Sequence, residues 1–99
     1  MALYQLILAY DGTEFSGFQR QGNTRTVQSE FEHVLQQFGW QEDSILFAGR
    51  TDAGVHASGQ VVSFSLEWKH SPTTLCNALN ARLPGDISVL KGSRAEAEF

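Results

Sequence analysis

A guanidinium and a carboxylate stand two residues apart in a short segment that glycines punctuate. Arg50 and Asp52 lie in the stretch 48–57, which reads AGRTDAGVHA. In an extended segment, side chains two positions apart point to the same side, so these two groups can pair. A neighbouring arginine favours the ionised form of a carboxylate, which is the form that a nucleophile or a general base needs. Asp52 is therefore the first candidate for a reactive group, with Arg50 as its partner.

The same residues also have a purely structural interpretation. Asp-Ala-Gly is a common turn sequence, and an arginine near an aspartate is often a surface ion pair that contributes little to stability. Residue types and spacing leave both interpretations open, because perturbed ion pairs occur in structural networks as well as in active sites. His56 lacks a neighbour that would fix its tautomer, so we expect a structural hydrogen bond from it. The histidines form no metal-ligand cluster, and we expect no metal.

Segments on both sides of Asp52 show the periodicities of strands and helices. Strands are predicted where apolar residues run together or alternate with polar ones, at residues 3–10, 44–49, 60–66 and 87–90. Helices are predicted where apolar residues recur at helical spacing, at residues 27–38 and 72–83. Thr26 and Ser71 suit the N-caps, Pro72 suits a first helical position, and Gly39 suits a C-terminal cap. Two acidic residues, Glu30 and Glu32, suit the dipole of the first helix.

This order of elements predicts an α+β fold of the ferredoxin-like βαββαβ type. Such a fold has an antiparallel four-stranded sheet with two helices on one face. Residues 49–59 are predicted to form a loop between the second and third strands, which places Asp52 at an end of the sheet. Loops held by a rigid scaffold are favoured places for reactive groups.

The composition indicates one domain. The chain has 99 residues, a hydrophobic fraction of 41%, a single cysteine and a net charge of −4 at pH 7. A single cysteine excludes an intrachain disulfide and fits a reducing compartment. No signal peptide or membrane-spanning run is visible, so we expect a cytoplasmic protein. The negative charge argues against RNA binding unless the basic surface is local or is supplied from outside this chain.

Four segments, in order along the chain, resemble motifs of the TruA family of tRNA pseudouridine synthases. Residues 49–57 resemble the catalytic signature of the family, and residues 59–64 (GQVVSF) continue it. Residues 10–21 (YDGTEFSGFQRQ) resemble the first motif, with Phe18 where the family commonly has tryptophan. Residues 77–87 (NALNARLPGDI) match a later helix-to-strand segment. The resemblance covers nearly the whole chain.

The resemblance implies a reaction and the residues that perform it. TruA-like enzymes isomerise uridine to pseudouridine in the anticodon stem-loop of tRNA (tRNA positions 38-40), without metal or cofactor. The residue that matches Asp52 is essential and is assigned as the nucleophile; attack on ribose C1′, addition to uracil C6 and abstraction of a ribose proton all remain open as its chemical step. The residue that matches Arg50 pairs with it and helps to hold the target base out of the RNA stack. Gln19 and Arg20 are expected RNA contacts by their position in the family, although an exposed loop arginine needs no special role.

The resemblance also implies a domain organisation. Residues 1–99 match the amino-terminal domain, which carries the catalytic aspartate. The second domain of the family, absent from this chain, supplies a tyrosine that stacks on the target base, further basic residues and part of a homodimer contact. We therefore expect the 99 residues alone to fold but not to turn over tRNA.

Two other functions fit parts of the same pattern. Non-catalytic RNA-binding modules of the RRM type share the βαββαβ topology, but they stack bases on aromatic residues of the sheet, and residues 60–66 contain only Phe64. Retroviral-type aspartic proteases are homodimers whose two carboxylates share a proton, and residues 52–54 nearly match their Asp-Thr/Ser-Gly motif. Exposed sheet aromatics would favour the first alternative, and a fold without helices would favour the second.

Overall fold

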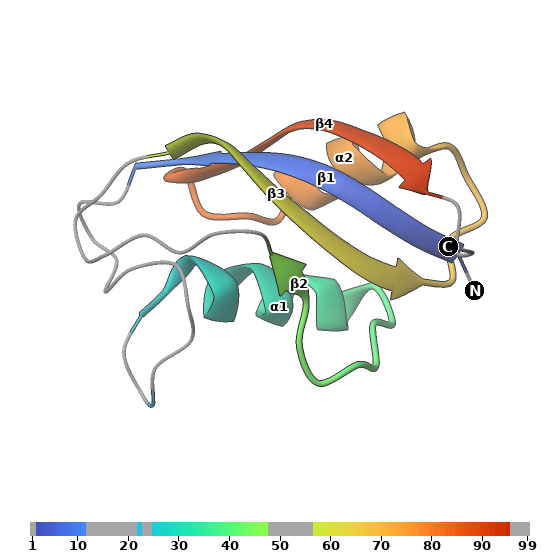
Figure 1. Ribbon diagram of the computed structural model, residues 1–99, viewed down its shortest axis with the longest axis horizontal. Helices are drawn as coiled ribbons and strands as arrows, with labels where there is room; N and C mark the ends of the chain where they lie inside the picture. Colours follow the sequence, from blue (N-terminus) through green and yellow to red (C-terminus); the bar gives the residue numbers. More distant parts are fainter. Residues whose placement is uncertain (1, 12–21, 23–24, 48–56, 96–99) are drawn as a thin grey trace.

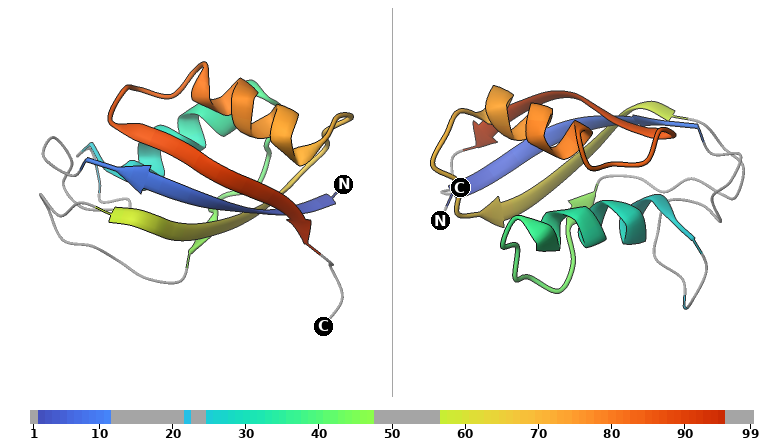
Figure 2. Two further views of the ribbon diagram at one scale, coloured as in Figure 1. Left: turned by 90° about the horizontal axis from the view of Figure 1, so that it is seen from above. Right: turned by 180° about the vertical axis from the view of Figure 1, so that it is seen from behind.

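The chain forms a four-stranded antiparallel sheet with both helices on one face (Figures 1 and 2). The computed structural model describes residues 2–11, 22, 25–47 and 57–95. The elements are β1 (Ala2–Tyr10), α1 (Val27–Gln37), β2 (Leu46–Phe47), β3 (Ala57–Leu66), α2 (Pro72–Asn80) and β4 (Ile87–Ala95). The strands lie side by side in the order β2-β3-β1-β4, and every neighbouring pair is antiparallel. The predicted α+β, ferredoxin-like βαββαβ fold is confirmed.

A single hydrophobic core lies between the sheet and the two helices. Alternate residues of each central strand point into it, because successive side chains of a strand face opposite sides. The buried residues are Tyr4, Leu6, Leu8 and Tyr10 in β1 and Val62, Phe64 and Leu66 in β3. The Phe64 ring joins the sheet to α1, since its centroid lies 5.9 Å from that of Phe31. The alternation predicted for residues 60–66 is therefore confirmed.

Both helices begin at the predicted caps. The Thr26 hydroxyl accepts a hydrogen bond from the Ser29 N–H, and the Ser29 hydroxyl accepts one from the Thr26 N–H, which is a capping box. Gly39 follows α1 with a φ of 97°, a left-handed conformation that glycine adopts without strain. Ser71 caps α2 by accepting from the Thr74 N–H at 3.2 Å, and Pro72 occupies the first turn. These local signals were sufficient to place the helix starts.

Several predicted boundaries were wrong. β2 has only two residues, β3 begins at Ala57 within the predicted loop, and β4 continues to Ala95 rather than ending at Leu90. The register of β4 against β1 passes from Val89 to Lys91, so Leu90 is an extra residue that interrupts the alternation. α2 ends at Asn80 rather than Leu83, although the Leu83 N–H still donates to the Leu79 carbonyl at 2.9 Å in the turn that follows.

α2 is fixed closely against β4. The Asn80 side chain donates to the Val89 carbonyl at 3.0 Å and accepts from the Val89 N–H at 2.7 Å, so it satisfies both backbone groups of an edge-strand residue. Gly92 of β4 allows the close approach, because a Cβ there would lie 2.5 Å from Leu6 Cδ2 and 2.6 Å from Cys76 Sγ. Asn80, in the family-like segment 77–87, thus helps to fix α2 against β4.

Candidate functional site

All four predicted site residues lie outside the described residues. These are the candidate catalytic pair Arg50 and Asp52 and the expected RNA contacts Gln19 and Arg20. Their assignments therefore stay predictions, and the structure describes instead the residues that border their segments. Asp11 and Arg25 border the first segment, and Phe47 and Ala57 border the second.

Of the bordering residues, Asp11 and Ala57 lie at one end of the sheet, whereas Phe47 is paired with Val62 farther along β3. Tyr10, the last residue of β1, is paired with Ala57 at the start of β3 and with Ile87 at the start of β4. The N-terminal end of α1 lies near the same end of the sheet (Figure 1). The family-like segments 10–21, 49–57 and 77–87 therefore each begin or end at this end of the sheet.

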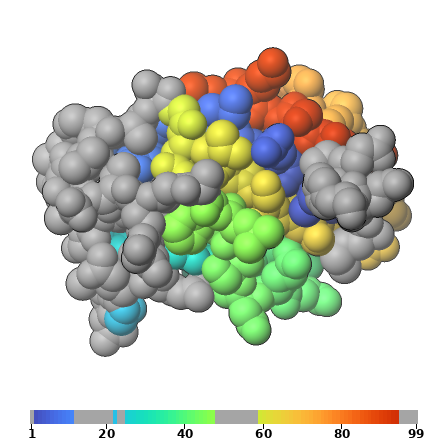
Figure 3. All heavy atoms as spheres, viewed as in Figure 1, coloured from blue at the N-terminus to red at the C-terminus, as the bar shows by residue number. Residues whose placement is uncertain are grey.

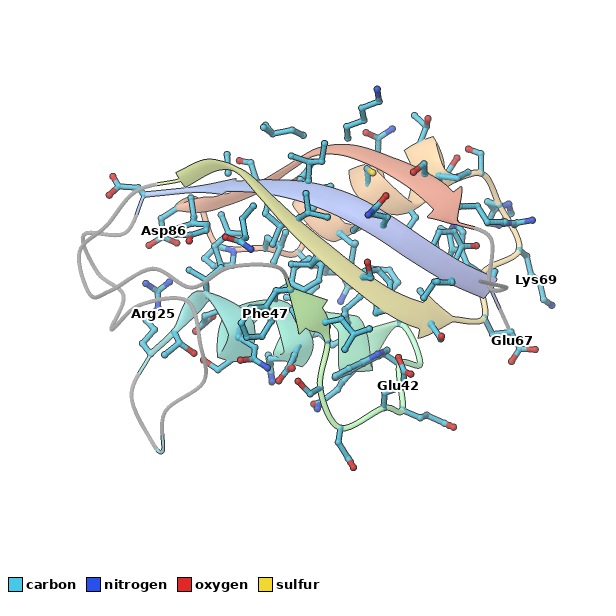
Figure 4. All side chains as sticks on the ribbon, in the orientation of Figure 1. Arg25, Glu42, Phe47, Glu67, Lys69 and Asp86 are labelled. Carbon is cyan, nitrogen blue, oxygen red and sulfur yellow. The ribbon has the colours of Figure 1, made fainter. Side chains whose placement is uncertain are left out.

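Asp86 connects three of these elements. Its backbone carbonyl accepts a hydrogen bond from the Asp11 N–H at 3.0 Å, just after β1. Its carboxylate accepts two hydrogen bonds from the Arg25 guanidinium, at 3.0 and 3.2 Å, just before α1. Arg25 also approaches Glu30, with 3.5 Å between Nε and Oε1. The hydrogen bond to Asp86 is the main reason that the pKa of Arg25 is raised above its ordinary value. Figure 4 shows Arg25 and Asp86 close together at this end of the molecule.

A buried polar cluster fixes the chain just ahead of β2. The Glu32 carboxylate, 3% exposed, accepts hydrogen bonds from the Gln28 side chain at 2.8 Å and from the Ile45 N–H at 3.1 Å. The Gln28 side chain also donates to the Ser44 hydroxyl at 3.0 Å. Residues 44 and 45 are thereby tied to α1. The prediction that Glu32 merely serves the helix dipole missed this contact.

Neither the pair of Arg25 and Asp86 nor the contact between Glu32 and Ile45 was predicted as part of the site. Arg25 and Asp86 are 61 residues apart in the sequence, and Glu32 and Ile45 are 13 apart. A spacing rule on one helix or one strand cannot find such pairs. The available signal was the type of residue. A glutamate on a helix face made mostly of core residues has a buried carboxylate, and a buried carboxylate needs a hydrogen-bonding partner.

A shallow hollow of about 240 Å³ opens on the sheet beside β2. It is lined by Gln5, Leu46, Phe47, Val61 and Ser63, none of which titrates near neutral pH. Figure 3 shows the surface where β1, β2 and β3 lie side by side. The hollow offers an amide, a hydroxyl and apolar surface, so it can contact a ligand but cannot itself supply a general base or a carboxylate nucleophile. It is smaller than the usual pocket for a drug-sized ligand.

The described part of the sheet does not have the surface that an RRM-like module needs. The expected stacking residue, Phe64, is 2% exposed and packs in the core. On the opposite face, the described outward positions of β1 and β3 carry no aromatic side chain, and Phe47 of β2 is partly buried against the core. The condition that was to favour this alternative is therefore not met.

The described residues also bear on the aspartic protease alternative, on metal binding and on a membrane span. Two capped helices contradict the helix-free fold that would have favoured an aspartic protease. Within the ranges that the structure describes, no three His, Cys, Asp or Glu side chains gather as a metal site requires. Nor does either helix in those ranges have the length and apolar character needed to cross a membrane.

Comparison with known proteins gives a consistent result. A family model described as tRNA pseudouridine synthase matches residues 6–98. The tRNA pseudouridine synthase A of Streptococcus equi subsp. equi is 52% identical over 100 residues, covering 100% of this chain and 40% of that protein. The proteins of the same name from Syntrophomonas wolfei and Thermodesulfovibrio yellowstonii are 44% and 43% identical, again over the whole chain and over 40% and 39% of their own lengths. The chain thus spans about 40% of the length of these relatives.

Proposed function

The chain belongs to the tRNA pseudouridine synthase family, and we propose from this premise that the protein isomerises uridine to pseudouridine in tRNA. The observation that carries the proposal is the family match over residues 6–98, which includes both motif segments and the sheet that holds their borders. Non-catalytic RNA-binding and aspartic protease functions have no comparable support.

The reaction defines what the protein must supply. The bond between uracil N1 and ribose C1′ breaks, a bond between uracil C5 and C1′ forms, and the hydrogen on C5 is released as a proton while N1 gains one. Atoms and electrons balance without an oxidant, a reductant or a second substrate. The protein must therefore hold the base out of its stack, keep it in place while it turns, and provide a group that assists bond cleavage.

We assign the catalytic role to Asp52 and the supporting role to Arg50. An ionised carboxylate can act as a nucleophile or as a base, and an adjacent guanidinium keeps it ionised. Arg50 also has the charge to contact the RNA backbone beside the extruded base. Gln19 and Arg20 are proposed as further RNA contacts.

The finer features of the function are also proposals. We propose the anticodon stem-loop as the target, a homodimer as the working form, and the cytoplasm as the location. We further propose that residues 1–99 form the domain that carries the catalytic aspartate, and that a second domain contributes to the active site. The chain spans about 40% of the length of its relatives, which supports a contribution from additional polypeptide.

The function is tested with the full-length protein and a tRNA transcript that carries tritium at C5 of its uridines. Because C5 exchanges its hydrogen for a bond to ribose, turnover releases tritium to solvent. We expect release from the normal transcript and none from a matched transcript in which cytidine replaces the uridines of the anticodon stem-loop. Equal release from both transcripts would contradict the proposed target, and no release from either would contradict the proposed activity.

A further inference from the structure

We propose that Arg25 and Asp86 are positioning residues for the isomerisation, acting together as a clasp at the end of the sheet where β3 begins. Neither residue was predicted as part of the site. The proposal rests on the proposed function, because positioning is measured through pseudouridine formation. The clasp consists of Arg25, Asp86 and the Asp11 N–H, and all three belong to the described part of the chain.

The geometry of the clasp fixes how the Arg25 guanidinium and the Asp86 carboxylate are oriented, in addition to attracting their charges. The Asp86 carboxylate accepts two separate guanidinium hydrogen bonds, at 3.0 and 3.2 Å, while its backbone carbonyl accepts the Asp11 N–H at 3.0 Å. A two-pronged contact fixes both the distance and the angle between the two planar groups. One residue thus holds the chain leaving β1 and the chain entering α1 in a fixed relation to β4.

The clasp is mechanically connected to the start of β3. Asp86 precedes Ile87, which pairs with Tyr10, and Tyr10 also pairs with Ala57. Ala57 is five residues after Asp52 in the sequence. A shift of Asp86 is therefore transmitted through adjacent strands to the point at which the chain that carries Asp52 enters the sheet. Misplacement of a reacting group by about 1 Å can lower a rate by about 100-fold.

Loss of the pair is expected to leave the protein folded. The side chains of Arg25 and Asp86 are 37% and 24% exposed, so solvent screens part of the attraction between their charges. Neither Arg25 nor Asp86 is fully buried, whereas the polar residues Thr26, Gln28 and Glu32 are. Variants that break the pair are therefore expected to fold, which allows a positioning effect to be measured separately from a folding effect.

The test compares Arg25→Gln, Asp86→Asn, the double variant and Arg25→Lys in the full-length protein. The matched control is Arg82→Gln, which makes the same change in charge and also removes a side-chain contact, the 2.9 Å hydrogen bond to Gln37. Single-turnover tritium release at saturating tRNA gives the rate of the chemical step, and filter binding gives the Kd for tRNA. Thermal unfolding verifies that each variant is folded.

We expect Arg25→Gln and Asp86→Asn each to lower the single-turnover rate by about tenfold or more, with the Kd for tRNA changed by less than about threefold. Because the two residues act as one unit, the double variant should lose no more than the worse single variant. Arg25→Lys, which keeps one charged contact, should recover part of the rate. Arg82→Gln should stay within about twofold of wild type.

Several results would overturn the proposal. An unchanged rate in folded Arg25→Gln and Asp86→Asn proteins would do so, as would an equal loss in Arg82→Gln or multiplied losses in the double variant. These outcomes all require an active wild type, and they would leave the proposed function intact. A wild-type protein that forms no pseudouridine would instead contradict the proposed function, and the positioning role with it.

Discussion

Single buried polar groups decide how the borders of the candidate site are held. Glu32 is the clearest case, since its carboxylate is almost fully buried and accepts from the Ile45 N–H and the Gln28 side chain. Glu32→Ala would leave both donors without this acceptor, and a buried donor without a partner costs about 1–3 kcal/mol. We therefore expect a loss of this size in the free energy of unfolding, measured by urea denaturation of the 99-residue chain.

The control for this experiment is the neighbouring residue on the same helix. His33 is exposed, so His33→Ala should change the free energy of unfolding by no more than about 0.5 kcal/mol. Equal effects of the two substitutions would show that the buried network around Glu32 contributes nothing specific.

The thiol of Cys76 provides a second prediction at this scale. The residue is 8% exposed, and burial raises the pKa of its thiol. Because the thiolate is the reactive form, iodoacetamide at about pH 8 should label Cys76 slowly in the folded chain and rapidly in urea. The raised pKa also means that this group stabilises the fold below the pKa of the unfolded thiol, about 8.5, and that this contribution is lost as the pH rises above it. Labelling at the same rate in both states would contradict the account.

Residue roles were predictable from sequence only where both partners are close in the chain. Thr26, Ser71 and Gly39 were assigned correctly, because a capping residue lies within a few positions of the backbone groups that it caps. Glu32 was assigned to the helix dipole, since its true partner at Ile45 lies beyond any helical spacing. The pair of Arg25 and Asp86 depends on the complete topology, so no local rule reveals it.

At the level of elements, the contact between α2 and β4 depends on a missing side chain. A Cβ at Gly92 would lie 2.5 Å from Leu6 Cδ2 and 2.6 Å from Cys76 Sγ, so these buried side chains or the backbone at Gly92 must shift. Overpacking of this kind costs about 1–3 kcal/mol. We expect Gly92→Ala to lower the free energy of unfolding by that amount, with Gly85→Ala as the control because a Cβ at Gly85 would meet nothing within 4 Å.

A second substitution tests the cause of this effect. Cys76→Ala removes one of the two atoms that would collide, so the double variant should be more stable than the sum of the single effects predicts. Strict additivity would show that contact with the sulfur atom is not part of the penalty.

Elements themselves were predicted better than their ends. The alternation in residues 60–66 and the helical spacing in residues 27–38 identified β3 and α1, because one face of each is buried in the same core. The prediction for β4 stopped too early, since the extra residue Leu90 changes which positions face inward and hides the remaining strand. β3 likewise starts within the predicted loop, and Gly59 is skipped in its pairing with β1.

At the level of the whole molecule, the sheet is a scaffold that brings Asp11, Ala57 and Asp86 together at one end. The family was recognisable from motifs in the sequence and is confirmed by the match over residues 6–98, whereas the reaction is a proposal. The assignments of Asp52, Arg50, Gln19 and Arg20 remain predictions, because all four lie outside the described residues.

The proposed contribution of a second domain gives a prediction about the whole molecule. The 99 residues include one core with both helices docked, so we expect the isolated chain to unfold cooperatively. We also expect it to release no tritium from labelled tRNA, since the relatives are much longer than the part that this chain matches. Robust release by the isolated chain would contradict the proposed need for a second domain.

The central claim is that Asp52 is the catalytic carboxylate, and Asp52→Asn in the full-length protein tests it most directly. This substitution keeps the size of the side chain and removes its charge. Tritium release from C5-labelled tRNA should fall at least about 10,000-fold, to background, with tRNA binding retained, as expected for a group needed only in the chemical step. Turnover equal to that of the wild type would contradict the account.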